Sequence, residues 1–209
     1  MPVLAHVESL VWPLLRERGF TLFGDATAWR RFDGGVDVVG FRVLDELSAG
    51  ALGCPPGSFF LDLGVHLDAV PGPHPEQRDG RLAPRPDECQ VTRRLPPAKR
   101  RSFHGETRIW VVEPDGANLG PVFGDALSKL RRALPGFDRF HGPRRALDAL
   151  ARAGRWHPHP GDEAWLEVTA YLAIAAGEYD VARARLERLL AETDSRRGRL
   201  RRALEMLPR

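Results

Sequence analysis

The stretch Ser58–Leu67, SFFLDLGVHL, decides the fold because apolar side chains occupy every second position over the length of a whole strand. Phe59, Leu61, Leu63, Val65 and Leu67 fall on one face. Phe60, Asp62, Gly64 and His66 fall on the other face. A strand of this pattern packs one face on a core and leaves the opposite face available for a functional site or another layer.

The sequence on both sides of this stretch predicts further strands. Asp33-Gly34-Gly35 is a turn sequence between two runs of strand-forming residues, which is typical of a hairpin. The third strand is expected to run from residue 58 to about residue 69. The other strands are expected at residues 27–33, 36–44, 89–95 and 107–113.

Helices are predicted at both ends of the chain. Apolar residues at helical spacing indicate an amphipathic helix before Gly19, with a kink or a later start near Trp12 because Pro13 lacks an N–H group. After the fifth strand the apolar period changes to about 3.6 residues. Helices are expected at residues 123–134, from Pro143 through Leu150, and at 163–176, 179–192 and 195–207.

Strands first and helices second favour an α+β fold, with an antiparallel sheet of about five strands packed with helices and a helical C-terminal extension. We place the α+β domain at residues 1–142 and the extension at 143–209. Gly177, Tyr179 and Ala182 resemble the turn of a tetratricopeptide-type hairpin. One hairpin cannot form a solenoid, so we favour an ordinary helical hairpin packed on the sheet domain.

The composition is that of a folded, water-soluble protein, with 43% hydrophobic residues, 28% charged residues and a net charge of +3. No apolar run reaches the roughly 18 to 20 residues needed to span a bilayer, and no secretion signal precedes the first helix. We therefore expect a cytoplasmic protein with no membrane partner. Cys54 and Cys89 fit neither a disulfide framework nor a metal-ligand spacing, which predicts two buried free thiols.

The polar residues of the sheet's non-core face form the candidate binding site. If the strands pair as neighbours, this face carries Arg42, Asp62, His66, Gln90 and Arg94, with Thr92 beside them. Asp62 and His66 lie about 13 Å apart along one strand, which argues against a catalytic dyad. We favour a recognition surface for an anionic or polar partner, with the two arginines as bidentate donors. The alternative is a solvated or helix-covered face with structural ion pairs.

Nothing in the sequence identifies a reaction. His141, His157 and His159 lack further ligands at established zinc spacing, and there is no phosphate-binding loop, nucleophile elbow or metalloprotease motif. We therefore assign no catalytic residue, metal or cofactor. The favoured function is a non-catalytic protein-interaction module, of an immunity-like or accessory kind. The alternatives are nucleic-acid binding through the arginine-rich segments 93–108 and 196–202, and an unrecognised enzyme that uses the polar sheet face.

Four segments, in this order, resemble one bacterial family, the domain of unknown function 4304. They are the first helix with Arg18-Gly19-Phe20, the strand with Trp29-Arg30-Arg31, the Phe59–Leu67 strand, and Glu88–Leu95. The resemblance covers about residues 1–150. It implies a small bacterial α+β protein and supplies no activity, because that family is itself uncharacterised.

Overall fold

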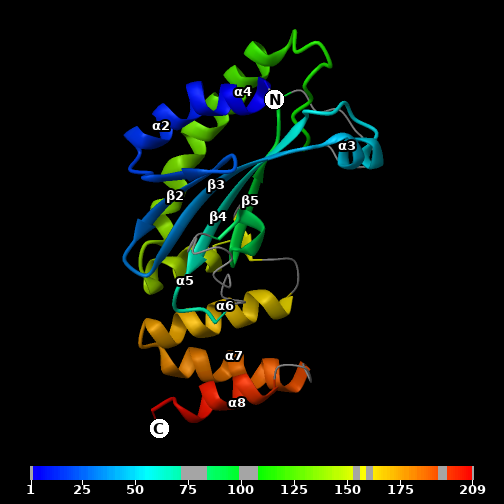
Figure 1. The fold of residues 1–209 in the computed structure, drawn as a ribbon. Coiled ribbons are helices and arrows are strands. Elements are labelled where there is room, and N and C mark those ends of the chain that lie inside the picture. Colours follow the sequence, from blue (N-terminus) through cyan, green and yellow to red (C-terminus); the bar gives the residue numbers. More distant parts are fainter. Residues whose placement is uncertain are drawn as a thin grey trace.

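The computed structural model describes residues 2–71, 84–98, 108–152, 156–158, 162–192 and 197–208. Within these ranges one antiparallel sheet has the strand order β1-β2-β3-β4-β5-β6, and three helices of a C-terminal extension stack beyond one end of it (Figure 1). The predicted α+β class, antiparallel sheet and helical C-terminal extension are therefore confirmed.

The sheet is a meander whose sixth strand returns from the C-terminal part of the chain. Its strands are β1 (Leu22–Gly24), β2 (Thr27–Phe32), β3 (Gly35–Val43), β4 (Phe59–Leu67), β5 (Val91–Leu95) and β6 (His157–Pro158). The first four predicted strands coincide with β2 to β5 within a few residues. β3 and β4 pair along their whole length, from Gly35 opposite Leu67 to Val43 opposite Phe59.

The strand predicted at 107–113 is wrong over its described residues, 108–113. Trp110 forms a single bridge with Phe59, and no ladder extends from that bridge. β5 already occupies the edge of β4 from Leu61 onward, so the later segment reaches only the end of β4. The Trp110 indole N–H donates to the Leu95 carbonyl at 2.9 Å, which fixes this segment beside the sheet.

The described helices and helical turns have the following bounds in chain order. The N-terminal helix consists of α1 (Pro2–His6), a π-helical segment η1 (Val7–Val11) and α2 (Trp12–Glu17). The middle of the chain contains α3 (Glu46–Leu52) and the 3-10 turn η3 (Pro86–Glu88). The remaining helices are α4 (Leu119–Ala133), η4 (Leu134–Phe140), α5 (Pro143–Ala151), α6 (Asp162–Ala175), α7 (Tyr179–Glu192) and α8 (Arg197–Glu205).

Pro13 does not break the N-terminal helix. In the π-helical segment before it, the Trp12 N–H bonds to the Val7 carbonyl, one residue further back than in an α-helix. A single π-helical turn is a common way for a helix to continue past a local interruption of its hydrogen-bond pattern. The helix then ends at Gly19, whose φ of +81° is a left-handed conformation that suits glycine.

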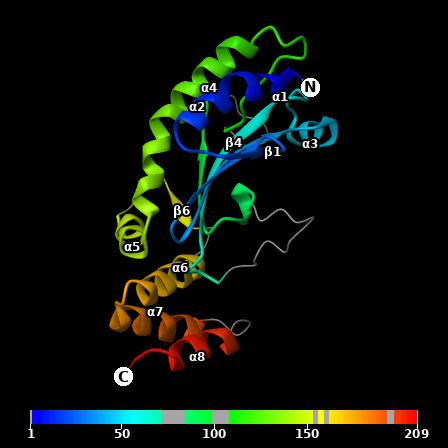
Figure 2. The same cartoon turned by 60° about the vertical axis from the view of Figure 1, so that its left-hand side comes forward.

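The main core lies between the sheet and the helices α1, α2 and α4, which share one side of it (Figure 2). The five apolar residues predicted for one face of β4 all belong to this core. Phe123 of α4 packs on Phe41 and Phe59, with ring centroids 6.3 and 5.5 Å apart respectively. The alternation of β4 therefore sets which face the helices cover.

The opposite face of the sheet is not free, because two short elements cover parts of it. Near one end, Phe60 packs in a cluster with Leu44 and Ala49 of the α3 region. Further along, η3 lies on Gly40 and Gly64, where a Cβ atom would come within 2.6 Å of Pro86 and Cys89 respectively. Asp62 lies between these two covered regions and is partly exposed.

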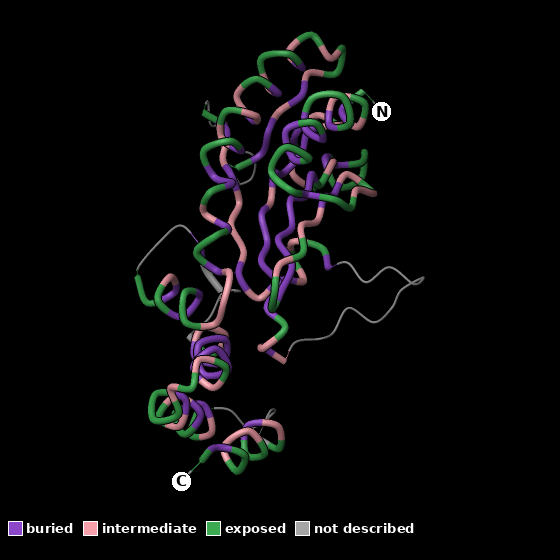
Figure 3. Tube along the Cα trace, turned by 90° about the vertical axis from the view of Figure 1, so that its left-hand side faces the viewer, coloured by how far each residue is buried: buried purple, intermediate pink, exposed green. Residues whose placement is uncertain are grey.

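The C-terminal helices are attached to the sheet and share its core. α6 and α7 form the predicted hairpin, with Gly177 at φ +76° in the turn, and α8 packs on α7. Buried stretches run along the strands and again through α6 and α7 (Figure 3). The domain boundary at residue 142 stays a prediction, and the β5–β6 pairing joins the two sides of that boundary.

Cys54 and Cys89 are buried free thiols, as predicted. In the described ranges of the chain, no helix combines the length and the apolar character that crossing a membrane requires.

Gly64→Ala should destabilise the protein by about 1 to 3 kcal/mol, because the added methyl group meets Cys89 and the backbone of Pro86 in a closely packed layer. Denaturant unfolding of both proteins measures this difference. The matched control is Gly124→Ala in α4, where an added Cβ has no neighbour within 4 Å. That control should be neutral or gain up to about 1 kcal/mol from helix propensity. Equal stability of the two variants would contradict the packing described for η3.

Candidate binding site

Three of the predicted site residues come together on the partly covered face of the sheet. Arg42 projects from β3, Asp62 from β4 and Arg94 from β5. Asp62 and Arg94 are directly opposite each other in the β4–β5 register. The Arg94 Nε and Nη2 groups donate to the two Asp62 carboxylate oxygens at 2.6 and 3.0 Å, which is a bidentate ion pair. The carboxylate is therefore already engaged by one of the two arginines.

Both guanidinium groups also lie against the same aromatic ring. Phe60 is opposite Arg42 in the β3–β4 register, and the Arg42 Cζ atom is 4.5 Å from the ring centroid. The Arg94 Cζ atom is 4.1 Å from the same centroid. Arg42 is exposed, and within the described part of the chain this ring contact is its only polar or aromatic interaction. Its guanidinium N–H groups are thus available to a ligand.

Two adjoining pockets share Arg42 and Arg94. The first, which we call the arginine–phenylalanine pocket, has a volume of about 360 Å³. Its lining residues are Arg42, Val43, Leu44, Ser48, Leu52, Phe60 and Arg94. The second, of about 170 Å³, extends toward η3 and includes the acidic residues Asp25, Asp62 and Asp87 together with Arg85. Of the two, only the first has arginines as the sole charged side chains of its described lining, so it is the part of this face that suits an anion.

His66 and Gln90, the other two predicted site residues, lie at the far end of β4 and take no part in this cluster. The Gln90 side chain accepts from the Leu67 N–H at 2.9 Å and donates to the Val70 carbonyl at 3.4 Å, which secures the end of the strand. His66 is 8% exposed, and its Nε2 atom is 3.7 Å from an Asp68 carboxylate oxygen. Four residues of strand separate His66 from Asp62, which agrees with the argument against a catalytic dyad.

Helix α3, which forms one wall of the arginine–phenylalanine pocket, was not predicted from the sequence. Two features of the sequence indicate this helix. Asp45 is a helix N-cap, whose carboxylate accepts from the Ser48 N–H at 2.8 Å and whose pKa is lowered by that hydrogen bond. Gly53 ends the helix in the left-handed conformation, at φ +71°. Both are standard helix boundaries, separated here by a short helix without a long apolar stripe.

The arginine-rich segments proposed for nucleic-acid binding are partly occupied by contacts within the protein. Arg93 lies 5.9 Å from the Trp156 ring, Arg94 is paired with Asp62, and Arg199 is paired with Glu167 on α6. Residues 99–107 and Arg196 lie outside the described residues. Arg201 and Arg202 of α8 are exposed, so only part of the described arginines of these segments is engaged in such contacts.

A buried carboxylate cluster lies on the helix-covered face and was not predicted. Asp37 of β3 is fully buried, and its Oδ2 atom accepts from Arg30 Nε at 2.8 Å. The same oxygen is 2.9 Å from Nε2 of His141, whose ring stacks on Phe32 with centroids 4.1 Å apart. Burial raises the pKa of the Asp37 carboxyl, while the Arg30 guanidinium and His141 act against that rise. These contacts clamp the end of η4 to β2 and β3.

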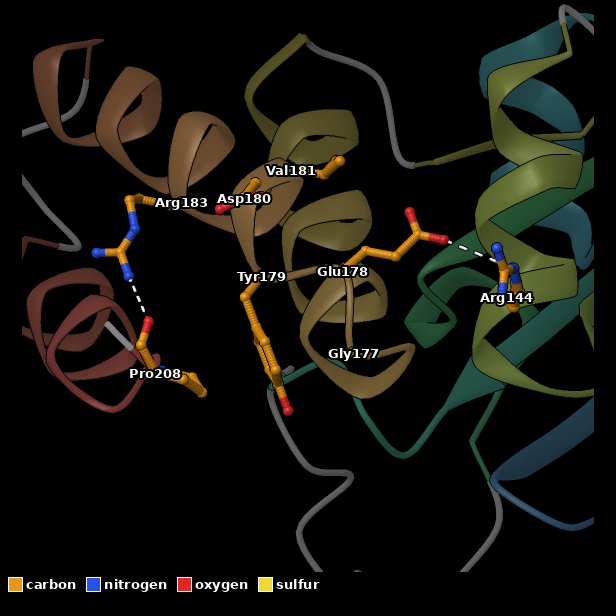
Figure 4. A pocket seen from close by; sticks show the side chains of 8 residues that line it. All are labelled: Arg144, Gly177, Glu178, Tyr179, Asp180, Val181, Arg183 and Pro208. Carbon is orange, nitrogen blue, oxygen red and sulfur yellow. Dashed lines mark hydrogen bonds and ion pairs between the residues drawn. The ribbon is translucent and has the colours of Figure 1, made fainter.

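A further pocket, of about 770 Å³, lies on the helical extension at the α6–α7 turn (Figure 4). Its charged residues form contacts with the protein itself. Arg144 is 3.6 Å from a Glu178 carboxylate oxygen, and Arg183 donates to the Pro208 carbonyl at 2.7 Å. With two arginines and two acidic residues around Tyr179, the pocket has no excess charge.

Metal-binding geometry gives no competing site within the described ranges. No group of three or more His, Cys, Asp or Glu side chains there is placed to hold a metal ion. His159 and the side chain of His157 lie outside the described residues. Burial raises the pKa of the Cys54 and Cys89 thiols, which disfavours their reactive thiolate forms.

No protein-family model, curated protein or solved structure matches the chain. The resemblance to the domain of unknown function 4304 therefore stays a prediction.

The raised pKa of Asp37 predicts a specific pH dependence of stability. A carboxyl with a higher pKa in the folded than in the unfolded chain stabilises the fold below its usual value of 3.8, and this contribution is lost as the pH rises through the folded-state pKa. Wild type should therefore lose stability relative to Asp37→Asn as the pH increases.

Urea unfolding of both proteins between about pH 3 and 5.5 measures this difference. If wild type instead gains stability relative to Asp37→Asn as the pH rises, then Arg30 and His141 outweigh burial and lower the pKa of Asp37.

Proposed function

We propose that this chain is a cytoplasmic, non-catalytic protein-interaction module that binds an acidic group of a partner protein in the arginine–phenylalanine pocket. One observation carries the proposal: Arg42 is exposed, stacked on Phe60, and free of any ion pair within the described residues. An arginine held in place by an aromatic ring loses little conformational freedom when it binds a carboxylate.

The surroundings of Arg42 support binding rather than structural pairing. Asp62 lies on the same face, but both of its carboxylate oxygens accept from Arg94. Arg94 also supplies a second positive charge at the same pocket. An anionic group of a partner would give Arg42 the ion pair that it lacks among the described residues.

The nucleic-acid alternative has weaker support. Backbone binding needs several arginines or lysines that face solvent along one surface. Arg93, Arg94 and Arg199 instead contact groups of the protein itself. The enzyme alternative is not supported by the pair considered in the sequence, since His66 lies four strand positions from Asp62 and is instead 3.7 Å from Asp68.

Affinity capture of the tagged protein from lysate tests the proposal. Wild type should retain a stoichiometric protein partner that Arg42→Ala loses, because the free guanidinium is the main anchor. The variant should fold normally, since surface substitutions usually change stability by about 0.5 kcal/mol or less. Arg131→Ala is the matched control, because Arg131 is an exposed arginine on α4, on the other side of the sheet.

Nuclease-treated lysate distinguishes the two binding hypotheses. Material that disappears after nuclease treatment would support the nucleic-acid alternative. A partner retained equally by wild type, Arg42→Ala and Arg131→Ala would sink the proposed role of the pocket.

A further inference from the structure

We infer that the arginine–phenylalanine pocket binds the C-terminal end of a partner polypeptide, with the terminal carboxylate on Arg42 and an apolar last side chain beside it. This inference rests on the proposed function and specifies the group that is bound. It follows from two properties of the pocket, its charge and its apolar wall, and from the geometry of a polypeptide chain end.

The charge of the pocket selects an anion of limited size. Arg42 and Arg94 are the only charged residues of its lining within the described part of the chain. Arg94 directs its Nε and Nη2 groups at Asp62, so Arg42 has the guanidinium edge that can form two parallel hydrogen bonds. One carboxylate matches this single edge, and the acidic residues of the neighbouring pocket disfavour a second negative charge nearby.

The rest of the pocket is apolar. Val43, Leu44, Leu52 and Phe60 line it beside the arginines, with Ser48 as the other polar residue. At about 360 Å³ its volume falls at the small end of ligand pockets, which span roughly 300 to 1,000 Å³. A purely charged ligand would leave this apolar wall in contact with water, whereas an apolar side chain would cover it.

A chain end delivers both groups to one place. In an extended polypeptide, neighbouring side chains point to opposite sides, so an internal Glu and the apolar residue next to it do not enter the same small pocket. At a C-terminus, the carboxylate and the last side chain leave the same Cα atom. An internal segment would also have to continue past the apolar wall with unsatisfied backbone groups, which is unfavourable.

Fluorescence anisotropy with labelled octapeptides tests this inference. The probes share a Gly/Ser body and end in Leu with a free carboxylate, in Leu-amide, in Ser with a free carboxylate, or in Leu-amide with one internal Glu. The Leu acid should bind at least about tenfold more tightly than each of the other three. Arg42→Ala should reduce the affinity for the Leu acid to that for the Leu-amide and leave the Leu-amide affinity unchanged.

A second pair of variants keeps the fold intact while changing the charge at the pocket. Ser48→Glu places a carboxylate at the exposed pocket wall, and Glu three residues after the Asp45 N-cap is favourable for the helix. Ser48→Gln is the neutral control of the same length. The Glu variant should weaken binding of the Leu acid at least about fivefold relative to the Gln variant, because the two carboxylates repel each other and compete for Arg42.

The outcomes separate this inference from the proposed function. If all four peptides bind equally, or if isovalerate alone competes as well as the Leu acid at equal concentration, the chain-end inference is wrong. If lysate capture still depends on Arg42 in that case, the proposed function stands. If neither peptide binding nor capture depends on Arg42, both are wrong.

Discussion

The pairing register of β4 with its two neighbours is the constraint on which the rest of the structure depends. It places Phe60 opposite Arg42 and Asp62 opposite Arg94, and it directs the alternate residues of β4 into the helix-covered core. A slip of one residue would turn that core set outward and separate the charged pair. Because β4 is buried on one face by α1, α2 and α4, and partly covered on the other by α3 and η3, such a slip would be opposed from both sides.

The same register explains why charge is distributed unevenly over this sheet. On the helix-covered face, Asp37 is fully buried with Arg30 and His141 around it. On the other face, Asp62 is paired with Arg94, and Arg42 has no acidic partner in the described part of the chain. Two carboxylates are thus paired within the scaffold, and one guanidinium is exposed without an acidic partner in the described part of the chain. The proposed binding role falls on Arg42, which takes part in neither of these internal ion pairs.

Much of the fold follows from local patterns, and the candidate site follows only in part. Strands β2 to β5 could be predicted because their alternation is local, whereas β6 has two residues and depends on where α5 and α6 place them. Arg42, Asp62 and Arg94 could be assigned to one face from the period of two residues. The Asp37–His141 contact could not be predicted, because it joins residues about a hundred positions apart through η4. Neither could the covering of Gly40 and Gly64, which depends on the path of the chain after β4.

The β5–β6 pairing described above also has a consequence for how the chain folds. β1 to β5 form a meander of sequential neighbours, and the described turn between β2 and β3 is short. The β5–β6 contact has to wait until α4, η4 and α5 have been laid across the sheet. Closing such a long intervening segment carries a large entropic penalty before any contact is gained, so β6 should join the sheet late. During synthesis, the edge of β5 would therefore stay open until His157–Pro158, about three-quarters of the way along the chain, have left the ribosome.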